Sequence, residues 1–211
     1  MDLRLDGKVA LVTGGSKGIG REIATAYAQS GAKVMITSRK ADACELAASE
    51  IGNGCEWFAS NVGYEDQVES LVDHTLDTFG AIDILVNNAG ANPYAGPTIN
   101  VDVPRWNKTI QVNMTAPLVL TQLCWNKYMK ESMGGCSIIN ISSVGGLTTN
   151  EQLGVYDVAK AGLIHLTKQL AAELGPKVRV NCIAPGLIKT DFAKILWDGE
   201  RGAEVAASYP M

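Results

Sequence analysis

The sequence predicts an α/β fold built on a doubly wound parallel sheet with helices on both faces. Short apolar runs alternate with longer segments of helical periodicity along the whole chain. A glycine-rich segment joins the first apolar run to the first helical segment. Near-continuous apolar strands that alternate with helices are typical of parallel sheets covered on both sides. We expect about six strands in the order 3-2-1-4-5-6, which such sheets usually adopt.

The elements follow one another with short connections. The segments expected to be buried strands are Lys8–Thr13, Lys33–Ser38, Cys55–Ser60, Ile82–Val86, Cys136–Ile141 and Val178–Ile183. The helices are expected at about Gly18–Ser30, Ala41–Ile51, Glu65–Phe79, Pro104–Glu131 and Val155–Leu174. Four of the helices are followed by glycines placed where glycine commonly ends a helix, namely Gly31, Gly52, Gly80 and Gly175. No linker or internal repeat separates these elements, so residues 1–211 are expected to form one domain.

Composition argues against several classes of protein. Hydrophobic residues make up 46% of the 211 residues, which is enough for a substantial core. The net charge of −4 argues against a nucleic-acid surface, which is normally basic. Charged residues in the first eight positions occupy the place of a signal peptide's apolar stretch. No apolar run approaches the roughly 18 residues that cross a bilayer. We therefore expect a cytoplasmic protein with no membrane or nucleic-acid partner.

Cysteine and histidine form no recognisable site. The 5 cysteines are scattered and include no C-x-x-C pair, so the sequence predicts neither a zinc site nor a disulfide framework. The 2 histidines, His74 and His165, fall in separate predicted helices. That separation argues against a serine–histidine triad. We expect no metal site.

A candidate proton-transfer site combines Tyr156, Lys160 and Ser143. Tyr156 and Lys160 are one helical turn apart, so they lie on the same face of a predicted helix. An ammonium beside a phenol favours the phenolate, and we expect Lys160 to lower the pKa of Tyr156 from about 10. The Ser143 hydroxyl is suited to hydrogen-bond the oxygen that gains or loses the proton. These groups together fit acid/base catalysis on an alcohol or a carbonyl, although Tyr-x-x-x-Lys alone is also common on exposed helix faces.

The segment T-G-G-S-K-G-I-G from Thr13 to Gly20 directly follows the first strand and opens the first helix. Glycines let a pyrophosphate approach the backbone there, and the helix N-terminus favours its negative charge. The spacing is G-x-x-x-G-x-G rather than the commoner G-x-G-x-x-G. A tight turn without a ligand is the alternative. The residues expected to bind a cofactor in this segment are Gly14, Ser16, Lys17, Gly18, Ile19 and Gly20.

The end of the second predicted strand bears on the choice of cofactor. In NAD sites a carboxylate about 20 residues after the glycines usually binds the ribose 2′-hydroxyl. Here Ser38 and Arg39 occupy that place, and Lys17 is expected to approach it from inside the glycine segment. Two cations without a carboxylate suit a 2′-phosphate, which an arginine binds through two hydrogen bonds. We expect NADP(H) to be preferred over NAD(H); a solvated loop is the alternative.

With Asn87-Asn88-Ala89-Gly90 after the fourth apolar run, these motifs closely resemble those of the short-chain dehydrogenases/reductases over nearly the whole chain. The resemblance implies a Rossmann fold that binds NAD(H) or NADP(H) and interconverts alcohols and carbonyls. It implies that Tyr156 is the general acid/base and that Lys160 lowers its pKa and binds the ribose. It also implies that Ser143 orients the substrate oxygen and that Asn113 holds a water in the proton relay.

Further roles follow from the same resemblance. Asn61-Val62 stands where the family usually has Asp-Val against the adenine, and Ser142 is expected to support the strand end. The remaining residues implied to border the cofactor are Ser38, Arg39, Asn61, Val62, Asn88, Ala89, Gly90, Pro185, Gly186, Ile188 and Thr190. The pocket walls are expected at Asn92–Tyr94, Leu147–Leu153 and Leu187–Trp197, with a substrate-loop region at about residues 187–211.

The family implied by the resemblance continues past the position of Met211 with a further helix and a seventh strand. We therefore expect a sheet that lacks the seventh strand, with Val178–Ile183 as an exposed edge that favours pairing with other chains. We also expect reduced stability and residues after about Trp197 that are poorly fixed. The family's habit of assembly implies a homo-oligomer, either a dimer or a tetramer.

The leading hypothesis is an NADP(H)-dependent oxidoreductase that acts on a small-molecule carbonyl or alcohol. A 3-oxoacyl-carrier reductase is one specialisation that shares these motifs. A non-catalytic nucleotide-binding relative is an alternative, and it would bind the cofactor without oxidising it. An epimerase or dehydratase on the same fold is another, and it would turn over substrate without net cofactor consumption.

Overall fold

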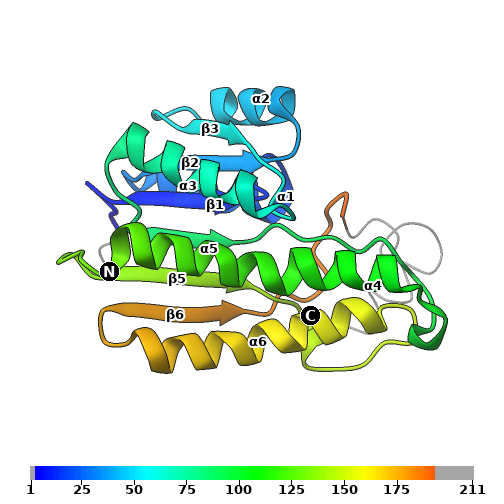
Figure 1. The fold of residues 1–211 in the computed structure, drawn as a ribbon. Coiled ribbons are helices and arrows are strands. Elements are labelled where there is room, and N and C mark those ends of the chain that lie inside the picture. Colours follow the sequence, from blue (N-terminus) through cyan, green and yellow to red (C-terminus); the bar gives the residue numbers. More distant parts are fainter. Residues whose placement is uncertain (1–2, 193–211) are drawn as a thin grey trace.

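The computed structural model describes residues 3–192, and these residues contain six strands in one parallel sheet. The strand order is β3-β2-β1-β4-β5-β6, which confirms the predicted fold class and order (Figure 1). The strands are β1 (Val9–Thr13), β2 (Lys33–Ser38), β3 (Glu56–Ala59), β4 (Ile84–Asn87), β5 (Cys136–Ile141) and β6 (Val178–Ile183). The structure therefore follows the predicted strands closely, with β3 shorter and β4 later than expected.

Helices cover both faces of the sheet, as predicted. α1 (Gly18–Gln29) and α2 (Ala41–Ile51) pack on one face, against β1, β2 and β3. α3 (Glu65–Phe79), α5 (Ala116–Cys124) and α6 (Gly154–Leu174) lie on the other face (Figure 1). Neighbouring residues of one strand enter different cores, since Leu11 packs with the second group of helices and Val12 with the first. This alternation follows from the two-residue period of a strand.

The predicted helix Pro104–Glu131 is interrupted in two places. It begins as α4 (Val103–Ile110), continues through the π-helical segment η2 (Gln111–Thr115) into α5, and ends with a second π segment, η3 (Trp125–Met129). In η2 the N–H of Ala116 bonds to the carbonyl of Gln111 five residues earlier. Pro117 lacks the N–H that would bond to the Asn113 carbonyl in a regular α-helix. The proline therefore gives a physical reason for the change of hydrogen-bond pattern at this point.

The helix ends agree with the glycine positions. Gly52 and Gly80 follow α2 and α3 with φ of 65° and 74°, a conformation that glycine adopts without strain. Gly175 ends α6 in an extended conformation instead, with φ of −69°. At the start of β1, the Asp83 carboxylate accepts the Val9 N–H at 2.9 Å. This bond fixes the start of β1 beside the connection to β4.

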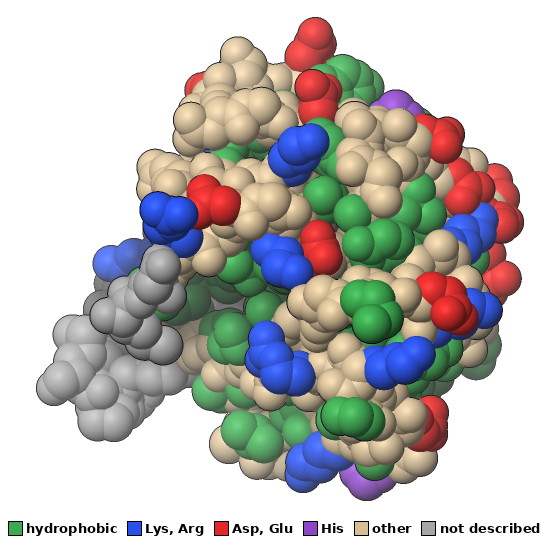
Figure 2. Space-filling model, turned by 90° about the vertical axis from the view of Figure 1, so that its left-hand side faces the viewer, with side chains coloured by type: hydrophobic (Ala, Val, Ile, Leu, Met, Phe, Trp, Pro, Cys, Tyr) green, Lys and Arg blue, Asp and Glu red, His purple; other side chains and the backbone are tan. Residues whose placement is uncertain are grey.

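β6 forms one edge of the sheet within the described part of the chain. Val178 and Val180 are buried, whereas Ile183 is 52% exposed. The expectation for residues after about Trp197 falls outside the described residues. No helix within the described residues is long and apolar enough to cross a membrane. On the face drawn in Figure 2, basic side chains are scattered singly among acidic and apolar ones.

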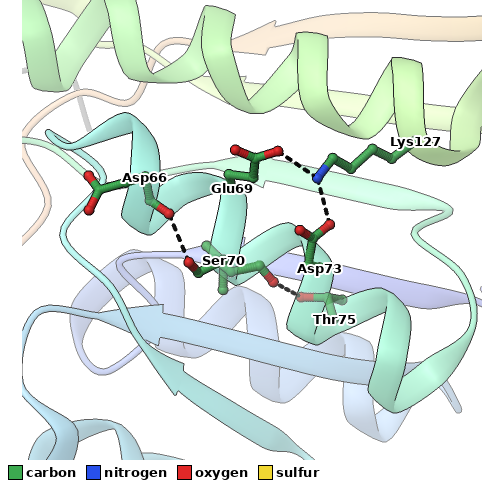
Figure 3. Close-up of polar contacts among 7 residues, drawn as sticks. Asp66, Glu69, Ser70, Asp73, Thr75 and Lys127 are labelled. Atoms are coloured by element: carbon green, nitrogen blue, oxygen red, sulfur yellow. Dashed lines mark hydrogen bonds and ion pairs between the residues drawn. The ribbon is translucent and has the colours of Figure 1, made fainter.

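An ion-pair cluster ties η3 to α3 on the surface. The Lys127 ammonium lies 2.7 Å from an Asp73 oxygen and 2.9 Å from a Glu69 oxygen, one turn apart on α3 (Figure 3). The hydrogen bonds that Lys127 donates to Asp73 and, with a smaller effect, to Glu69 raise the pKa of Lys127. All three side chains are partly exposed, so solvent screens the attraction between them. The cluster is therefore a modest clamp between two helices that already pack through their apolar sides.

We predict that Lys127→Met lowers the free energy of unfolding by less than about 1 kcal/mol, because exposed ion pairs contribute little. The loss should shrink at high salt. Urea denaturation at low and high ionic strength measures it. Lys168→Met is the matched control, since Lys168 is exposed on α6. A loss of several kcal/mol that does not depend on salt would show that Lys127 packs into the core.

Candidate active site

A cavity of about 690 Å³ opens at the carboxyl ends of β1, β4 and β5. β1 and β4 are neighbours in the sheet while the chain leaves them toward opposite faces, and ligands of open α/β sheets bind at such a point. The predicted site residues that line this cavity are Gly14, Lys17, Gly18, Ile19, Asn88, Ala89, Gly90, Ser143, Tyr156, Lys160, Pro185, Gly186, Ile188 and Thr190. The fold thus brings the glycine segment and the proton-transfer group to one cavity.

The first turns of α6 and the end of β5 position the proton-transfer group. Tyr156 and Lys160 lie on one face of α6, with the Lys160 ammonium 5.5 Å from the centre of the Tyr156 ring. Ser143 follows β5 and hydrogen-bonds the Tyr156 hydroxyl. The Lys160 side chain is only 3% exposed and donates to the carbonyl of Ile141 at 2.7 Å. The predicted group is therefore assembled within one small volume.

The pKa expected for Tyr156 is wrong for this structure. Burial raises the pKa of Tyr156 to about 12, against a smaller lowering by the Ser143 hydrogen bond. Burial also lowers the pKa of Lys160 to about 8. The ammonium bonds a strand carbonyl, and its own charge is disfavoured by the same burial. The loss of water around the Tyr156 phenol therefore has a larger effect on its pKa than the lowering expected from the Lys160 ammonium one helical turn away.

Asn113 lies in the π segment η2 and is fully buried. Its amide nitrogen donates to the carbonyls of Ala91 at 2.7 Å and Thr109 at 2.8 Å, and its oxygen accepts the Ala91 N–H at 3.3 Å. Both amide protons are used in these bonds, so the side chain fixes the backbone just after the Asn88–Gly90 motif. Asn113 does not line the cavity. Its role in a proton relay stays a prediction.

The glycine segment has the features of a pyrophosphate cradle. α1 begins after Lys17 without a side-chain cap and without an acid in its first turn, so its N–H groups and dipole are open to an anion. Gly14 and Gly18 have φ of 65° and 56°. A Cβ on Gly20 would overlap the Gly14 carbonyl and the Asn88 amide. The segment therefore packs closely under the cavity and fits a dinucleotide phosphate.

Six predicted cofactor residues lie outside the cavity lining, namely Ser16, Gly20, Ser38, Arg39, Asn61 and Val62. The end of β2 is nevertheless next to the glycine segment, because the Gly15 N–H donates to the Thr37 carbonyl at 3.0 Å. The Ser38 hydroxyl lies 3.0 Å from the Cys44 sulfur. The side-chain oxygen of Asn61 accepts the Gly63 N–H at 3.1 Å. Adenosine contacts at this end stay predictions.

Sequence reasoning assigned no supporting role to Thr13, Asn140 and Thr167, which stabilise the site. The Thr13 hydroxyl donates to the Val86 carbonyl and accepts the N–H groups of Asn88 and Ala89, both at 3.0 Å. Asn140 accepts a bond from Asn87 at 2.8 Å and donates to the Thr167 hydroxyl at 2.9 Å. The available signal was an asparagine inside an otherwise apolar strand, since buried polar groups require partners. Ser142 supports the strand end as expected, because its hydroxyl donates to the Lys160 carbonyl.

The segment after β6 passes between the glycine segment and Tyr156. The Phe192 ring lies 6.0 Å from the Tyr156 ring, and Lys17 is 3.4 Å from the Asp191 carboxylate. The predicted walls contribute Asn92, Thr148–Asn150, Leu153 and residues 187–192 to the cavity lining. The expected wall at residues 193–197 and the rest of the substrate-loop region fall outside the described residues.

Within the described residues no group of three or more His, Cys, Asp or Glu side chains is placed to hold a metal ion. The five cysteines are free thiols. Burial raises the pKa of Cys55 and of Cys124 to about 12, which disfavours the reactive thiolate form. Ser143, Tyr156 and Lys160 stay the predicted proton-transfer group of the cavity.

A family model described as short chain dehydrogenase matches residues 8–201. The chain belongs to the short-chain dehydrogenase family. Dehydrogenase/reductase SDR family member 4 of Rattus norvegicus is 42% identical over 197 residues, covering 92% of this chain and 70% of the relative. The human protein of the same name is 40% identical with the same coverage.

Solved structures agree with this assignment. A short-chain type dehydrogenase/reductase from Mycobacterium ulcerans superposes with a TM-score of 0.91 at 32% identity, covering 99% of this chain and 78% of that structure. A 3-ketoacyl-(acyl-carrier-protein) reductase from Brucella melitensis, complexed with NADH, gives 0.85 at 33% identity, with coverage of 89% and 78%. This short-chain dehydrogenase is an NAD(P)-dependent oxidoreductase, and carbonyl–alcohol interconversion is the general activity of its family.

We predict that Asn113→Ala lowers the free energy of unfolding by about 2–4 kcal/mol, because it leaves buried backbone groups of Ala91 and Thr109 without partners. Urea denaturation measures the change. Asn107→Ala, at an exposed position of α4, is the control and should change stability little. If both variants unfolded at the same urea concentration, the bonds to Ala91 would not hold this loop in solution.

Proposed function

We propose that this chain is an NADP(H)-dependent oxidoreductase that interconverts a carbonyl compound and a secondary alcohol by hydride transfer, with Tyr156 as the general acid/base. The convergence of Ser143, Tyr156 and Lys160 on the cavity that the glycine segment also lines supports this proposal. A binding module has no need of a buried lysine beside a tyrosine, because burying an ammonium is costly. The placement of these groups next to a phosphate cradle favours catalysis.

When bound, the nicotinamide cofactor supplies or accepts the hydride. In the reductive direction the Ser143 hydroxyl orients the substrate carbonyl oxygen, and Tyr156 gives that oxygen its proton. A phenol with a pKa near 12 is protonated at neutral pH, which is the form that this step requires. Lys160, with a pKa near 8, is mostly charged at the same pH and binds the ribose hydroxyls. Asn113 holds the loop after Gly90 and, as expected from the resemblance, a relay water.

We predict that Tyr156→Phe abolishes turnover while cofactor affinity stays within a few-fold, because the ring still packs but the transferable proton is gone. NADPH consumption and fluorescence titration of NADPH measure the two quantities. Lys160→Ala should impair both turnover and cofactor affinity, since the ammonium is assigned to assist Tyr156 and to bind the ribose hydroxyls. Substantial activity in Tyr156→Phe would require another acid.

The preference for NADP(H) rests on Arg39 at the end of β2 and on Lys17 in the glycine segment. Arg39 is exposed directly after β2, and Lys17 lines the cavity. The segment Thr37-Ser38-Arg39-Lys40 contains no carboxylate, which an NAD site would use for the ribose. The Brucella melitensis structure contains NADH, so that relative accepts the unphosphorylated cofactor. The cations of this chain favour the phosphorylated form.

We predict that Arg39→Ala weakens NADPH binding about 10–100-fold, because a charge-assisted hydrogen bond contributes about 1.5–3 kcal/mol. NADH binding should change little and serves as the internal control. Isothermal titration calorimetry with both cofactors measures the two affinities. Equal or tighter binding of NADH by the unsubstituted protein would exclude the assigned preference.

The specific substrate has one candidate with structural support. The Brucella melitensis neighbour is a 3-ketoacyl-(acyl-carrier-protein) reductase, so a 3-oxoacyl thioester is a candidate substrate. A panel of ketones, aldehydes and acyl thioesters assayed for NADPH loss discriminates among the candidates. A non-catalytic relative would bind cofactor without consuming it on any member of the panel, and an epimerase or dehydratase would form product without net cofactor loss.

We also propose one domain, a homo-oligomer and a cytoplasmic location. The residues that are described share one sheet with a core on each face, which supports a single folding unit. The exposed sides of the helices that carry Asn113 and Tyr156 are the proposed interface, and α4 and α6 pack side by side. Light scattering of the purified chain measures the oligomeric state.

A further inference from the structure

Asp157 directly follows Tyr156 in α6 and is 6% exposed. Both of its carboxyl oxygens are shielded from solvent and have no hydrogen-bond partner within the described residues. A Cβ on Gly145 would overlap one of these oxygens. The Asp157 carboxyl therefore fills the space that a side chain at position 145 would occupy, against the loop that carries Ser143.

A buried carboxylate without a partner is costly, and native proteins seldom keep one without a reason. Burial raises the pKa of Asp157 to about 6, and the nearby Asn150 backbone N–H offsets only part of that rise. The η4 turn (Val144–Gly146) and η2, which pack on α6, carry no acid or base. The charged or titratable side chains on the other elements packed on α6, or in the cavity, are Arg179 and Cys182 of β6, Cys136 of β5, Arg105 and Lys108 of α4, and Lys17, Lys189 and Asp191.

Asp157 reaches the reacting groups by contact and by charge. The Gly145 N–H, beside the carboxyl, donates to the Ser143 hydroxyl at 3.1 Å. Ser143 in turn hydrogen-bonds Tyr156. The negative charge of Asp157 also raises the pKa of Tyr156. Asp157 is thus linked to both hydroxyls that are assigned to the substrate oxygen.

We propose that Asp157 is a positioning residue whose buried carboxyl, through Gly145 and through its charge, sets how firmly the Ser143–Tyr156 pair holds its proton. The inference rests on the proposed function, in which Tyr156 transfers that proton. Below pH about 6 the carboxyl is neutral and exerts no field. Above that pH it is ionised, and Tyr156 retains its proton to higher pH than Lys160 and Ser143 alone would allow.

Asp157→Asn tests this role, because the amide keeps the shape of the carboxyl and removes its charge. The pH dependence of kcat/KM for NADPH-dependent reduction is measured for the parent, Asp157→Asn and the control Glu173→Gln, an exposed acid in the last turn of α6. The ratio of kcat/KM for Asp157→Asn to kcat/KM for the parent should change about fivefold between acidic and alkaline pH, with its midpoint near 6. The alkaline limb of the kcat/KM profile of Asp157→Asn should move to lower pH. The corresponding ratio for Glu173→Gln should stay constant.

A second measurement needs no turnover. The folded-state pKa of Asp157, about 6, lies above its ordinary value of 3.8, so folding favours the protonated carboxyl. The ionised carboxyl therefore lowers the stability of the parent above pH about 6, and this loss disappears as the pH falls toward 4. Asp157→Asn should gain melting temperature relative to the parent as the pH rises through that range. Carbon-13 titration of the parent carboxyl should give the same midpoint.

The outcomes separate the two proposals. A constant kcat/KM ratio for Asp157→Asn across pH, or a carboxyl that titrates near its ordinary value, overturns the role of Asp157 and leaves Tyr156 untouched. Activity retained by Tyr156→Phe overturns the proposed function, whatever the stability measurement gives. A kcat/KM ratio that varies with pH for Glu173→Gln as well would also overturn the inference, because an acid away from Ser143 and Tyr156 would then have the same effect.

Discussion

The parallel direction of every strand is the constraint on which the site depends. Because β1, β4, β5 and β6 all run in the same direction, the segments that follow them all begin at the carboxyl-terminal end of the sheet. Polar residues at this end of the sheet form hydrogen bonds that connect these segments. Thr13 joins β1 to the backbone after β4, and Asn140 joins β4 to α6 through Asn87 and Thr167. These bonds, together with the apolar cores on both faces of the sheet, position the segments that line the cavity.

The same carboxyl-terminal end of the sheet contains buried ionisable side chains, which a hydrophobic core normally excludes. Lys160 and Asp157 are buried within one helical turn of each other, and Tyr156 directly precedes Asp157. Burial shifts the pKa of all three away from their ordinary values, downward for the lysine and upward for the acid and the phenol. Such perturbed groups beside a cavity are characteristic of functional sites, because stability alone would replace them with apolar residues. The chain accepts this cost at the first turns of α6.

The sequence was sufficient where a local pattern determines the structure. The apolar runs that became β2, β5 and β6 and the glycines around Gly18 have strong local signatures, and they were placed within a residue or two. The pKa of Tyr156 was not predictable, because helical spacing reveals a neighbouring charge but not the loss of water around the phenol. Asp157 looked like an ordinary acid in a first helical turn, since the space left by Gly145 exists only in three dimensions. The distance in sequence between Thr13 and Asn88 likewise concealed their bond.

The π segments in the stretch from Val103 to Met129 restrict how this part of the chain can vary in length. A π turn holds one more residue than an α turn, so everything after it is rotated about the helix axis. Val112 in η2 and Leu120 in α5 both pack into the same core. Deleting one residue from η2 would leave an ordinary α turn and keep Leu120 facing the sheet, whereas a deletion between η2 and Leu120 would rotate Leu120 by about 100° about the helix axis. A change in the number of residues is therefore accommodated more easily within the π turns than elsewhere in this stretch.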